Sequence, residues 1–235
     1  MKLHKALEIN GEPHKLVNES IQLDLFLPGR ASFTVVSRKP LKGLIRYRCG
    51  YDLANIKPYF LGYVETATTV DQQQQRLFCR ELSASLYYPL SIIANNVALL
   101  DVLDQLSSKT GLRFITPDNA PSYLQNRTAK FYALANGYYA LRTLSKVFGY
   151  QQPLWQQEAD GSVYVGAWSD SRWASTPVSI PNRWQQVVGV ADGARVPAIP
   201  ALRPGVQIDG RIVTQLTFAD VHMHLSWSEN PWSLA

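Results

Sequence analysis

The sequence predicts an α+β fold that is mostly β. Alternating apolar and polar residues between turn signals fill residues 1–86 and predict strands of a small barrel or sandwich. Apolar residues at helical spacing in residues 87–170 predict a middle domain with two helices and a hairpin. Prolines punctuate residues 171–235, which is typical of strands and their connections rather than of helices. The chain of 235 residues is long enough for these three domains.

Residues 1–86 contain a series of alternating runs. In the first clear run, four apolar residues alternate with polar ones and with Phe26: Ile21, Leu23, Leu25 and Leu27. We expect Pro28-Gly29 to break this strand. Further strands are expected at 33–37, 45–49, 59–66 and 76–82. One face of each strand then covers a core, and the other meets water or a neighbouring molecule.

The middle domain, residues 87–170, is predicted to hold two amphipathic helices. The first has an apolar stripe of Leu99, Val102, Leu103 and Leu106, with Asn95 or Asn96 as its cap, Asp101 in its first turn and Gly111 at its end. The second helix spans about 137–148. Its stripe is Ala140, Leu144, Val147 and Phe148, and Gly149 ends it.

Strands surround these helices. A short strand at 112–116 is stopped by Pro117. The runs 155–158 and 162–168 flank Ala159-Asp160-Gly161, and an Asp-Gly pair between alternating runs indicates a hairpin. In residues 171–235 we expect strands at 206–213 and 216–227. In the latter, Val221, Met223, Leu225 and Trp227 point one way, and His222 and His224 point the other.

Composition disfavours several functional classes. The net charge of +5 is mild and no run of Lys or Arg stands out, whereas a dedicated nucleic-acid-binding protein concentrates its charge. Cys49 and Cys79 are too few for a disulfide framework or a zinc site and are expected as buried free thiols. The N-terminus has no apolar signal region, and no stretch is long enough to span a membrane. Low charge (17%) and many aromatics (11%) favour subunit contacts.

No catalytic motif is present, so we nominate no catalytic, cofactor-binding or metal-binding residues and expect no cofactor. His222 and His224 share a strand face and could ligate one metal, but the chain offers no nearby third ligand beyond Asp220. Two polar residues on an outward face are the simpler interpretation. The carboxylate pairs Asp101 with Asp104, and Glu65 with Asp71, could serve glycoside hydrolysis. Solvated positions on a helix and at a strand end are the simpler interpretation.

All six tryptophans lie at or after Trp155. Such clustering is compatible with a sugar-binding surface. It is equally typical of a packed core and of subunit interfaces, and the positions of Trp155, Trp168, Trp184 and Trp227 in or beside strands favour this second interpretation.

The order of these segments resembles the baseplate hub proteins of contractile-tailed phages, including the late-control protein D and Mu-like tail protein families. It is also similar to the N-terminal half of type VI secretion spike proteins. The likeness is carried by the strand pair 59–64 and 76–82, the helix within 97–114, the helix and hairpin within 136–168, and the strands at 203–208 and 213–227. It covers most of the chain and depends on order and spacing.

The resemblance implies two small tube-like β-barrels, 1–86 and 171–235, joined by the helix-containing middle domain 87–170. It implies a structural protein rather than an enzyme. Three copies would form a pseudo-six-fold ring, an adaptor between the hexameric tail tube and a separate trimeric spike protein. The protein would assemble in the bacterial host cytoplasm and end in the virion tail, with no specific nucleic acid and no membrane span.

The chain departs from this family in its length. Hub proteins are usually longer, and a second barrel would have to be built from about 65 residues, at 171–235. Two alternatives therefore stay open: a cell-wall-degrading or glycan-binding tail component, and a barrel that binds single-stranded nucleic acid.

Overall fold

The computed structural model describes residues 2–187 and 193–234. Met1, 188–192 and Ala235 lie outside the described residues, so the expected domain 171–235 is described in part. The fold is mostly β, with few helices, as the sequence predicts. The helices are α1 (Leu99–Thr110), α2 (Gly137–Phe148) and the short α3 (Arg172–Ser175). None of the described helices has the length and apolar character needed to cross a membrane.

Strands dominate both ends of the chain. The first β region holds β1 (His4–Ile9), β2 (Glu12–His14), β3 (Leu16–Asp24), β4 (Leu27–Val36), β5 (Gly43–Gly50), β6 (Lys57–Thr69) and β7 (Gln74–Glu81). The middle unit holds β8 (Ile92–Ala98), β9 (Phe114–Ile115), β10 (Arg127–Ala133), β11 (Pro153–Gln157) and β12 (Val163–Ala167). The last β region holds β13 (Gln186–Val187), β14 (Gly193–Pro197), β15 (Gln207–Ile208), β16 (Arg211–Ala219) and β17 (His222–Ser228).

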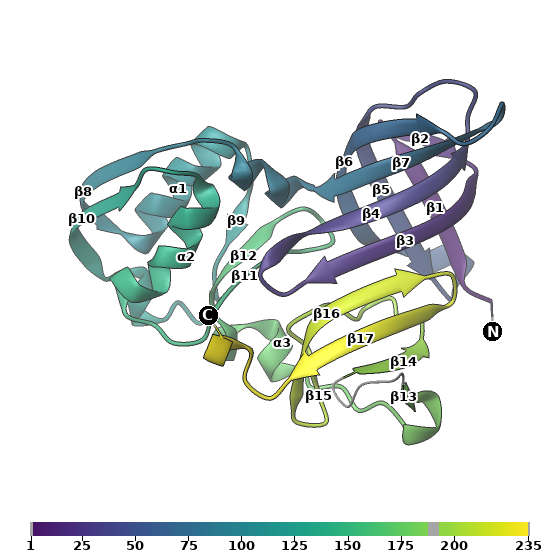
Figure 1. The fold of residues 1–235 in the computed structure, drawn as a ribbon. Helices are drawn as coiled ribbons and strands as arrows, with labels where there is room; N and C mark the ends of the chain where they lie inside the picture. Colours follow the sequence, from purple (N-terminus) through teal and green to yellow (C-terminus); the bar gives the residue numbers. More distant parts are fainter. Residues whose placement is uncertain (1, 188–192, 235) are drawn as a thin grey trace.

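The two β regions share one antiparallel sheet of twelve strands. Its order is β13-β14-β17-β16-β3-β4-β7-β6-β5-β1-β2, with β15 beside β16 (Figure 1). The regions join where β3 pairs with β16, from Ser20 opposite Ala219 to Asp24 opposite Gln215. No sheet among the described residues closes on itself, so the two-barrel arrangement is not confirmed.

One hydrophobic core lies behind this shared sheet. Phe218 of β16 packs against Tyr59, with ring centroids 5.4 Å apart, and against Tyr47, at 6.0 Å. Phe33 extends this aromatic cluster from β4. A second core belongs to the middle unit, where α1 and α2 pack their apolar stripes against β8 and β10. The last β region therefore depends on the first for burial, and the middle unit supplies its own core.

Several local expectations are confirmed. Gly111 and Gly149 follow α1 and α2 in the left-handed conformation, as expected. The structure adds a cap that the sequence analysis does not predict, because Asn136 accepts a hydrogen bond from the Tyr139 N–H at the start of α2. The β11–β12 hairpin turns around Asp160-Gly161, as expected. Cys49 and Cys79 are buried free thiols, and burial raises the pKa of each to about 12.

Turn positions differ from the prediction in three places. The first turn lies at Leu25 and Phe26, so Pro28 and Gly29 belong to β4 and Leu27 is exposed. The expected strand 216–227 is a hairpin, because Asp220 takes φ 53° and the chain reverses there, which leaves Val221 exposed. The run 206–213 likewise turns at Asp209-Gly210.

Two helix details also differ. Asn95 and Asn96 lie in β8, and α1 begins after Ala98, whose N–H donates to the Asp101 carboxylate over 2.8 Å. The acidic residue of the first turn thus replaces the expected asparagine cap. Val147 points outward from α2, and Leu141 completes the buried stripe instead.

A buried polar junction joins the three parts of the chain. Arg203, from the last β region, donates to the Glu81 carboxylate at the end of β7 over 2.8 Å. The same guanidinium donates to the backbone oxygens of Tyr59, over 2.7 Å, and Gln157, over 3.0 Å. The second Glu81 oxygen accepts from the Gly29 N–H at 2.7 Å. A Cβ at Gly29 would lie 2.8 Å from the Glu81 side chain, so glycine permits this approach.

The Gln157 side chain adds a second set of bonds at this junction. Its amide donates to the Leu61 oxygen and accepts from the Ser83 N–H, each over 2.8 Å. Arg203, Glu81 and Gln157 are all almost fully buried. Buried charges need partners of this kind, because an unpaired buried charge is costly.

A second ion pair marks the seam between β1 and β3, which approach each other without pairing. Lys5 of β1 lies 2.6 Å from the Glu19 carboxylate of β3 and 3.4 Å from Asp220 in the β16–β17 turn. Burial raises the pKa of Glu19 above its usual value, and the Lys5 ammonium opposes this shift. The seam is thus held by one partly desolvated lysine.

We expect Arg203→Met to lower the free energy of unfolding by about 3–5 kcal/mol, because it leaves the buried Glu81 carboxylate without its cationic partner. Arg113→Met is the matched control. It removes the exposed Arg113–Asp160 pair and should cost at most about 1 kcal/mol. Urea unfolding of both variants measures the difference. Equal losses would show that the junction contributes no more than a surface pair.

The seam predicts a pH dependence of known sign. Because the pKa of Glu19 is higher in the folded chain than in the unfolded chain, the wild type loses stability as pH rises between these two values. Glu19→Gln removes this loss. Its stability relative to wild type should therefore be higher at about pH 7 than at about pH 4. Lys5→Met should enlarge the wild-type loss. Urea titrations at both pH values test this, and a change of opposite sign would contradict the assignment.

Candidate functional site

The outer face of the shared sheet carries small polar residues around a single exposed aromatic ring. Ser20 of β3, Ser32 of β4 and Phe78 of β7 lie opposite one another across three strands. Phe78 is 46% exposed. A shallow cavity of about 210 Å³ lies over these residues, with Gln22, Arg30, Glu65 and Arg80 at its rim. Apolar and charged groups are thus presented together on an open surface.

Two arginines face each other on this sheet. Arg30 of β4 is directly opposite Arg80 of β7, a placement that is unfavourable for like charges. Arg80 donates to both Glu65 oxygens over 3.0 and 3.1 Å. Arg30 donates only to the Gln22 side chain, over 3.2 Å, and no carboxylate in the described part of the chain pairs with it. One positive charge on this face is therefore left without an anion.

Tyrosines gather where the sheet meets the middle unit. Tyr87 is the last residue of the connecting 3-10 helix (Leu82–Tyr87), and Tyr88 follows it. Tyr138 and Tyr139 lie in the first turn of α2. Tyr138 stacks on Tyr87 with ring centroids 4.9 Å apart, and its hydroxyl donates to the Phe26 oxygen in the β3–β4 turn. We call these four residues the tyrosine joint. Tyr88 is 66% and Tyr139 49% exposed, so the joint both fastens the two parts and presents aromatic surface.

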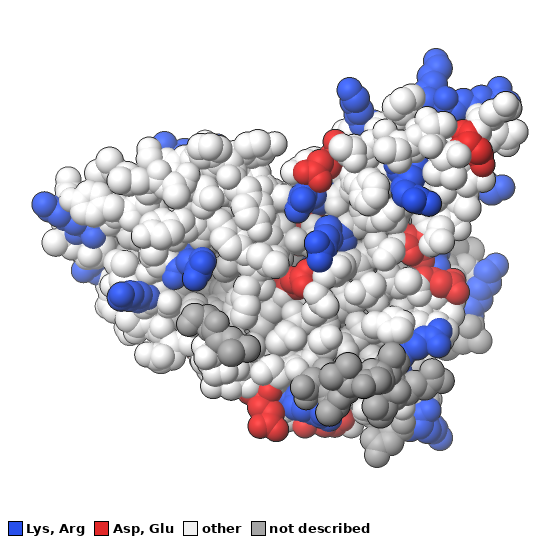
Figure 2. Space-filling model, viewed as in Figure 1, with Lys and Arg blue, Asp and Glu red and all other residues white. Residues whose placement is uncertain are grey.

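The charged side of α2 continues this surface. Tyr139, Arg142 and Lys146 point outward at helical spacing. The chain has no acidic residue from 119 to 157, and neither Arg142 nor Lys146 pairs with a carboxylate among the described residues. Figure 2 shows Lys and Arg over both the sheet and the lobe that holds α2. In this view the latter lobe shows no Asp or Glu among its described residues.

We call this continuous surface the front face: Arg30, Phe78 and Arg80 on the sheet, the tyrosine joint, and Arg142 and Lys146 on α2. Local sequence patterns do not reveal the front face, because its residues come from four separate segments. Two signals were present in the sequence: the doublets Tyr87-Tyr88 and Tyr138-Tyr139, and the stretch without acidic residues.

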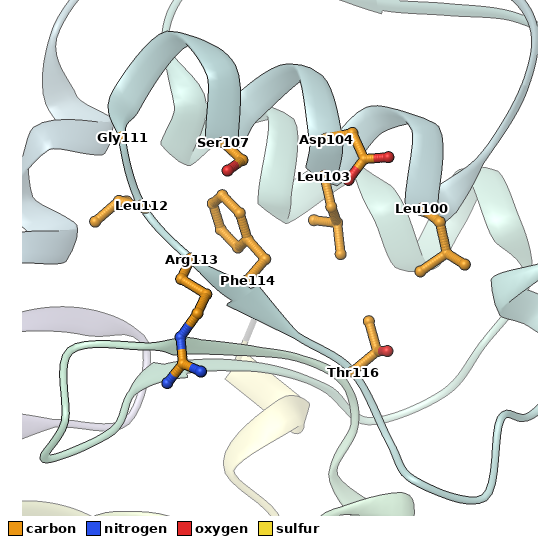
Figure 3. A pocket seen from close by; sticks show the side chains of 9 residues that line it. All are labelled: Leu100, Leu103, Asp104, Ser107, Gly111, Leu112, Arg113, Phe114 and Thr116. Carbon is orange, nitrogen blue, oxygen red and sulfur yellow. The ribbon is translucent and has the colours of Figure 1, made fainter.

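A separate pocket of about 260 Å³ lies between α1 and β9. Figure 3 shows Leu103 and Ser107 of α1 toward Phe114, whereas Arg113 extends away from the helix. The Arg113 guanidinium pairs with Asp160 in the β11–β12 turn. Asp104 is the carboxylate of the lining, and no second carboxylate or nucleophile with a base joins it there. The arrangement offers no acid–base pair.

The structure separates the other candidate residues. Asp101 caps α1 and lies 3.5 Å from Arg127, away from the Asp104 pocket. Glu65 pairs with Arg80, and Asp71 accepts from the Gln73 N–H in the β6–β7 turn. His222 contacts Arg195 through its Nδ1, 2.9 Å from the guanidinium, and His224 is exposed. No group of three possible metal ligands occurs in the described ranges.

The tryptophans occupy core positions for the most part. Trp155, Trp173 and Trp227 are buried, and Trp168 and Trp232 are partly buried, with their indole N–H groups donating to backbone oxygens. Trp184 is the exposed one. This distribution favours packing over a sugar-binding surface.

The chain is similar to a phage protein of unknown role. No protein-family model matches it. An uncharacterized 58.7 kDa protein of Haemophilus phage HP1 is 28% identical over 218 residues, which is 92% of this chain and 40% of that protein. The chain thus spans less than half the length of this relative.

Solved structures share the fold. The 43 kDa tail protein of prophage MuSo2 from Shewanella oneidensis superposes with a TM-score of 0.72 at 11% identity, over 97% of each chain. The tail protein from Neisseria meningitidis MC58 gives 0.67 at 11% identity, over 98% of this chain and 97% of that one. A type VI secretion component of Escherichia coli gives 0.59 at 12% identity, over 94% and 76%. The chain has the fold of phage tail proteins, and the resemblance seen in the sequence is confirmed at that level.

The tyrosine joint predicts a specific loss. Tyr138→Phe removes the hydrogen bond to the Phe26 oxygen and should lower the free energy of unfolding by about 0.5–1.5 kcal/mol. Tyr139→Phe, the neighbouring exposed tyrosine, should leave stability unchanged. Urea unfolding compares the two, and hydrogen exchange should show faster opening of the β3–β4 turn in Tyr138→Phe alone. Equal behaviour of both variants would contradict the fastening role.

Proposed function

We propose that the chain is a structural component of a phage or phage-like tail, and that it serves as the baseplate hub. In this role three copies form a ring-shaped adaptor between the tail tube and a separate spike protein. The observation that carries the proposal is the shared fold with tail proteins over nearly the full length of this chain. The domains 1–86, 87–170 and 171–235 are part of the proposal, with the two β regions in the place of the two barrels.

The internal construction supports a load-transmitting role. The shared sheet, its single core and the Arg203 junction tie the two β regions and the middle unit to one another. A ring adaptor needs such rigidity, because its contacts on two sides must keep a fixed spacing.

At the end of the sheet formed by β2, we expect assembly through side-chain contacts rather than through pairing of strand edges. The edge strand β2 has three residues, and two of them are Glu12 and Pro13. Short edge strands with charge and proline discourage pairing with a further strand. We therefore infer that neighbouring copies or partners meet this region side chain to side chain.

The position of the chain in a virion follows from the same proposal. The protein is made in the bacterial host and is retained in the tail, without a catalytic role. The cell-wall-degrading or glycan-binding alternative gains no specific observation among the described residues, since the candidate carboxylates are separated and the tryptophans are mostly packed.

Light scattering behind a sizing column tests the ring. We expect a mass of three times the 26.4 kDa of the chain for the protein alone or, after addition of the spike protein from the same phage, the mass of that trimer plus the bound spike. Purified peptidoglycan is the control substrate and should stay intact. A monomer that binds neither spike nor tube protein would overturn the adaptor role.

A further inference from the structure

We propose that the front face is the docking surface for a partner protein that presents acidic side chains. This inference rests on the proposed function and specifies which surface of the adaptor meets a partner and by what chemistry. It assigns the sheet cavity around Phe78, the tyrosine joint and the outward side of α2 to a single interface.

Charge determines the kind of partner. Arg30 faces Arg80 across two strands, and Glu65 compensates only Arg80. Arg142 and Lys146 stand on a helix within a stretch that has no acidic residue. Asp24, the other carboxylate on the sheet side, is already engaged by the Gln215 amide over 2.6 Å. Acidic groups from outside the chain would relieve the repulsion between these cations.

The apolar part of the face has the composition of a binding interface. Tyrosine and arginine are enriched where partners bind most tightly, because both combine a large contact area with hydrogen bonding. Tyr88 and Tyr139 of the joint are exposed, and so are Phe78 on the sheet and Leu27 at the start of β4. Tyr63 of β6 lies opposite Arg80 of β7, so its ring is on the same side of the sheet as Arg80.

A protein partner fits this face better than a nucleic acid. The Tyr87 and Tyr138 rings stack on each other, so these faces are not free to stack on bases. Glu65 and Asp24 lie within the surface, where they would repel a phosphate backbone. Carboxylates on a protein can be placed singly against Arg30 and Arg142, away from both acidic groups.

Contacts of Tyr138 also fix the position of α2 relative to the sheet, so the front face is preorganised. Tyr138 ties α2 to the β3–β4 turn, and it packs edge-on against Trp155 at 4.9 Å. The sheet and the helix thus present their side chains at a fixed spacing before any partner arrives. Binding then loses less conformational entropy than it would on a mobile surface.

The experiment uses the full chain with the tail tube protein and, separately, the spike protein of the same phage. Affinity is measured by biolayer interferometry at about 50 mM and about 300 mM NaCl. We expect wild-type binding to one of them to weaken with salt. The double variant Arg30→Glu/Arg142→Glu should weaken it at least about tenfold. Tyr88→Ala should weaken it in the same direction.

Matched controls carry the same changes elsewhere. Lys39→Glu/Lys57→Glu alters two exposed cations outside the front face by the same net charge, and Leu53→Ala truncates an exposed apolar residue there. Both controls should bind within about twofold of wild type. Circular dichroism confirms that every variant is folded.

The outcomes separate the inference from the proposed function. If wild type binds tube or spike and the front-face variants bind equally well, the docking surface is wrong and the adaptor role stands. If the variants lose only self-association, the occupant is a second copy and the proposal of a different acidic partner is overturned. Tight binding of an oligonucleotide to this face would overturn it too. If wild type binds neither protein, the adaptor role fails and the inference fails with it.

Discussion

The buried contact of Arg203 with Glu81 is the constraint on which the arrangement of this protein depends. The guanidinium reaches the end of β7, the backbone of β6 and the last residue of β11 at once. Each of these partners belongs to a different part of the chain or to a different strand. Since a buried charge must keep its partners, the first β region, the last β region and the middle unit cannot separate without exposing or stranding that charge.

Apolar side chains of the shared sheet also hold the two β regions together. The last β region is too small to bury its strands alone, and Phe218 completes a core that Tyr47 and Tyr59 begin. Pairing of β16 with β3 satisfies the backbone groups of both strands along their common edge. Because β16 and β4 pair with the two edges of β3, β1 does not pair with β3. The Lys5–Glu19 ion pair joins β1 and β3 instead.

Local sequence patterns predict most helices and strands of this fold. They do not predict the contacts between residues that are far apart in the sequence. Alternating runs on both sides predict the Asp160-Gly161 turn. The Asp209-Gly210 turn lies inside the run 206–213, which has the pattern of one strand, because the strand before the turn, β15, is only two residues long. Pro28-Gly29 is a typical turn sequence, but here Gly29 lies in β4 and lets the Glu81 carboxylate approach its N–H. Nothing local marks Arg203 and Glu81 as partners. The front face was equally hidden, because strand pairing brings Arg30 and Arg80 together across fifty residues.

The front face and the Arg203–Glu81 junction share one segment of the chain. Glu81 ends β7 directly before the 3-10 helix that carries Tyr87, and Arg80 precedes it on the outer side of the strand. Inward, this short segment anchors Arg203; outward, it presents Arg80 and the first residues of the tyrosine joint. A partner on the front face would therefore contact a segment that the buried Arg203–Glu81 ion pair anchors. If the proposed role holds, force applied at that face would pass into all three parts of the chain through these hydrogen-bonded groups.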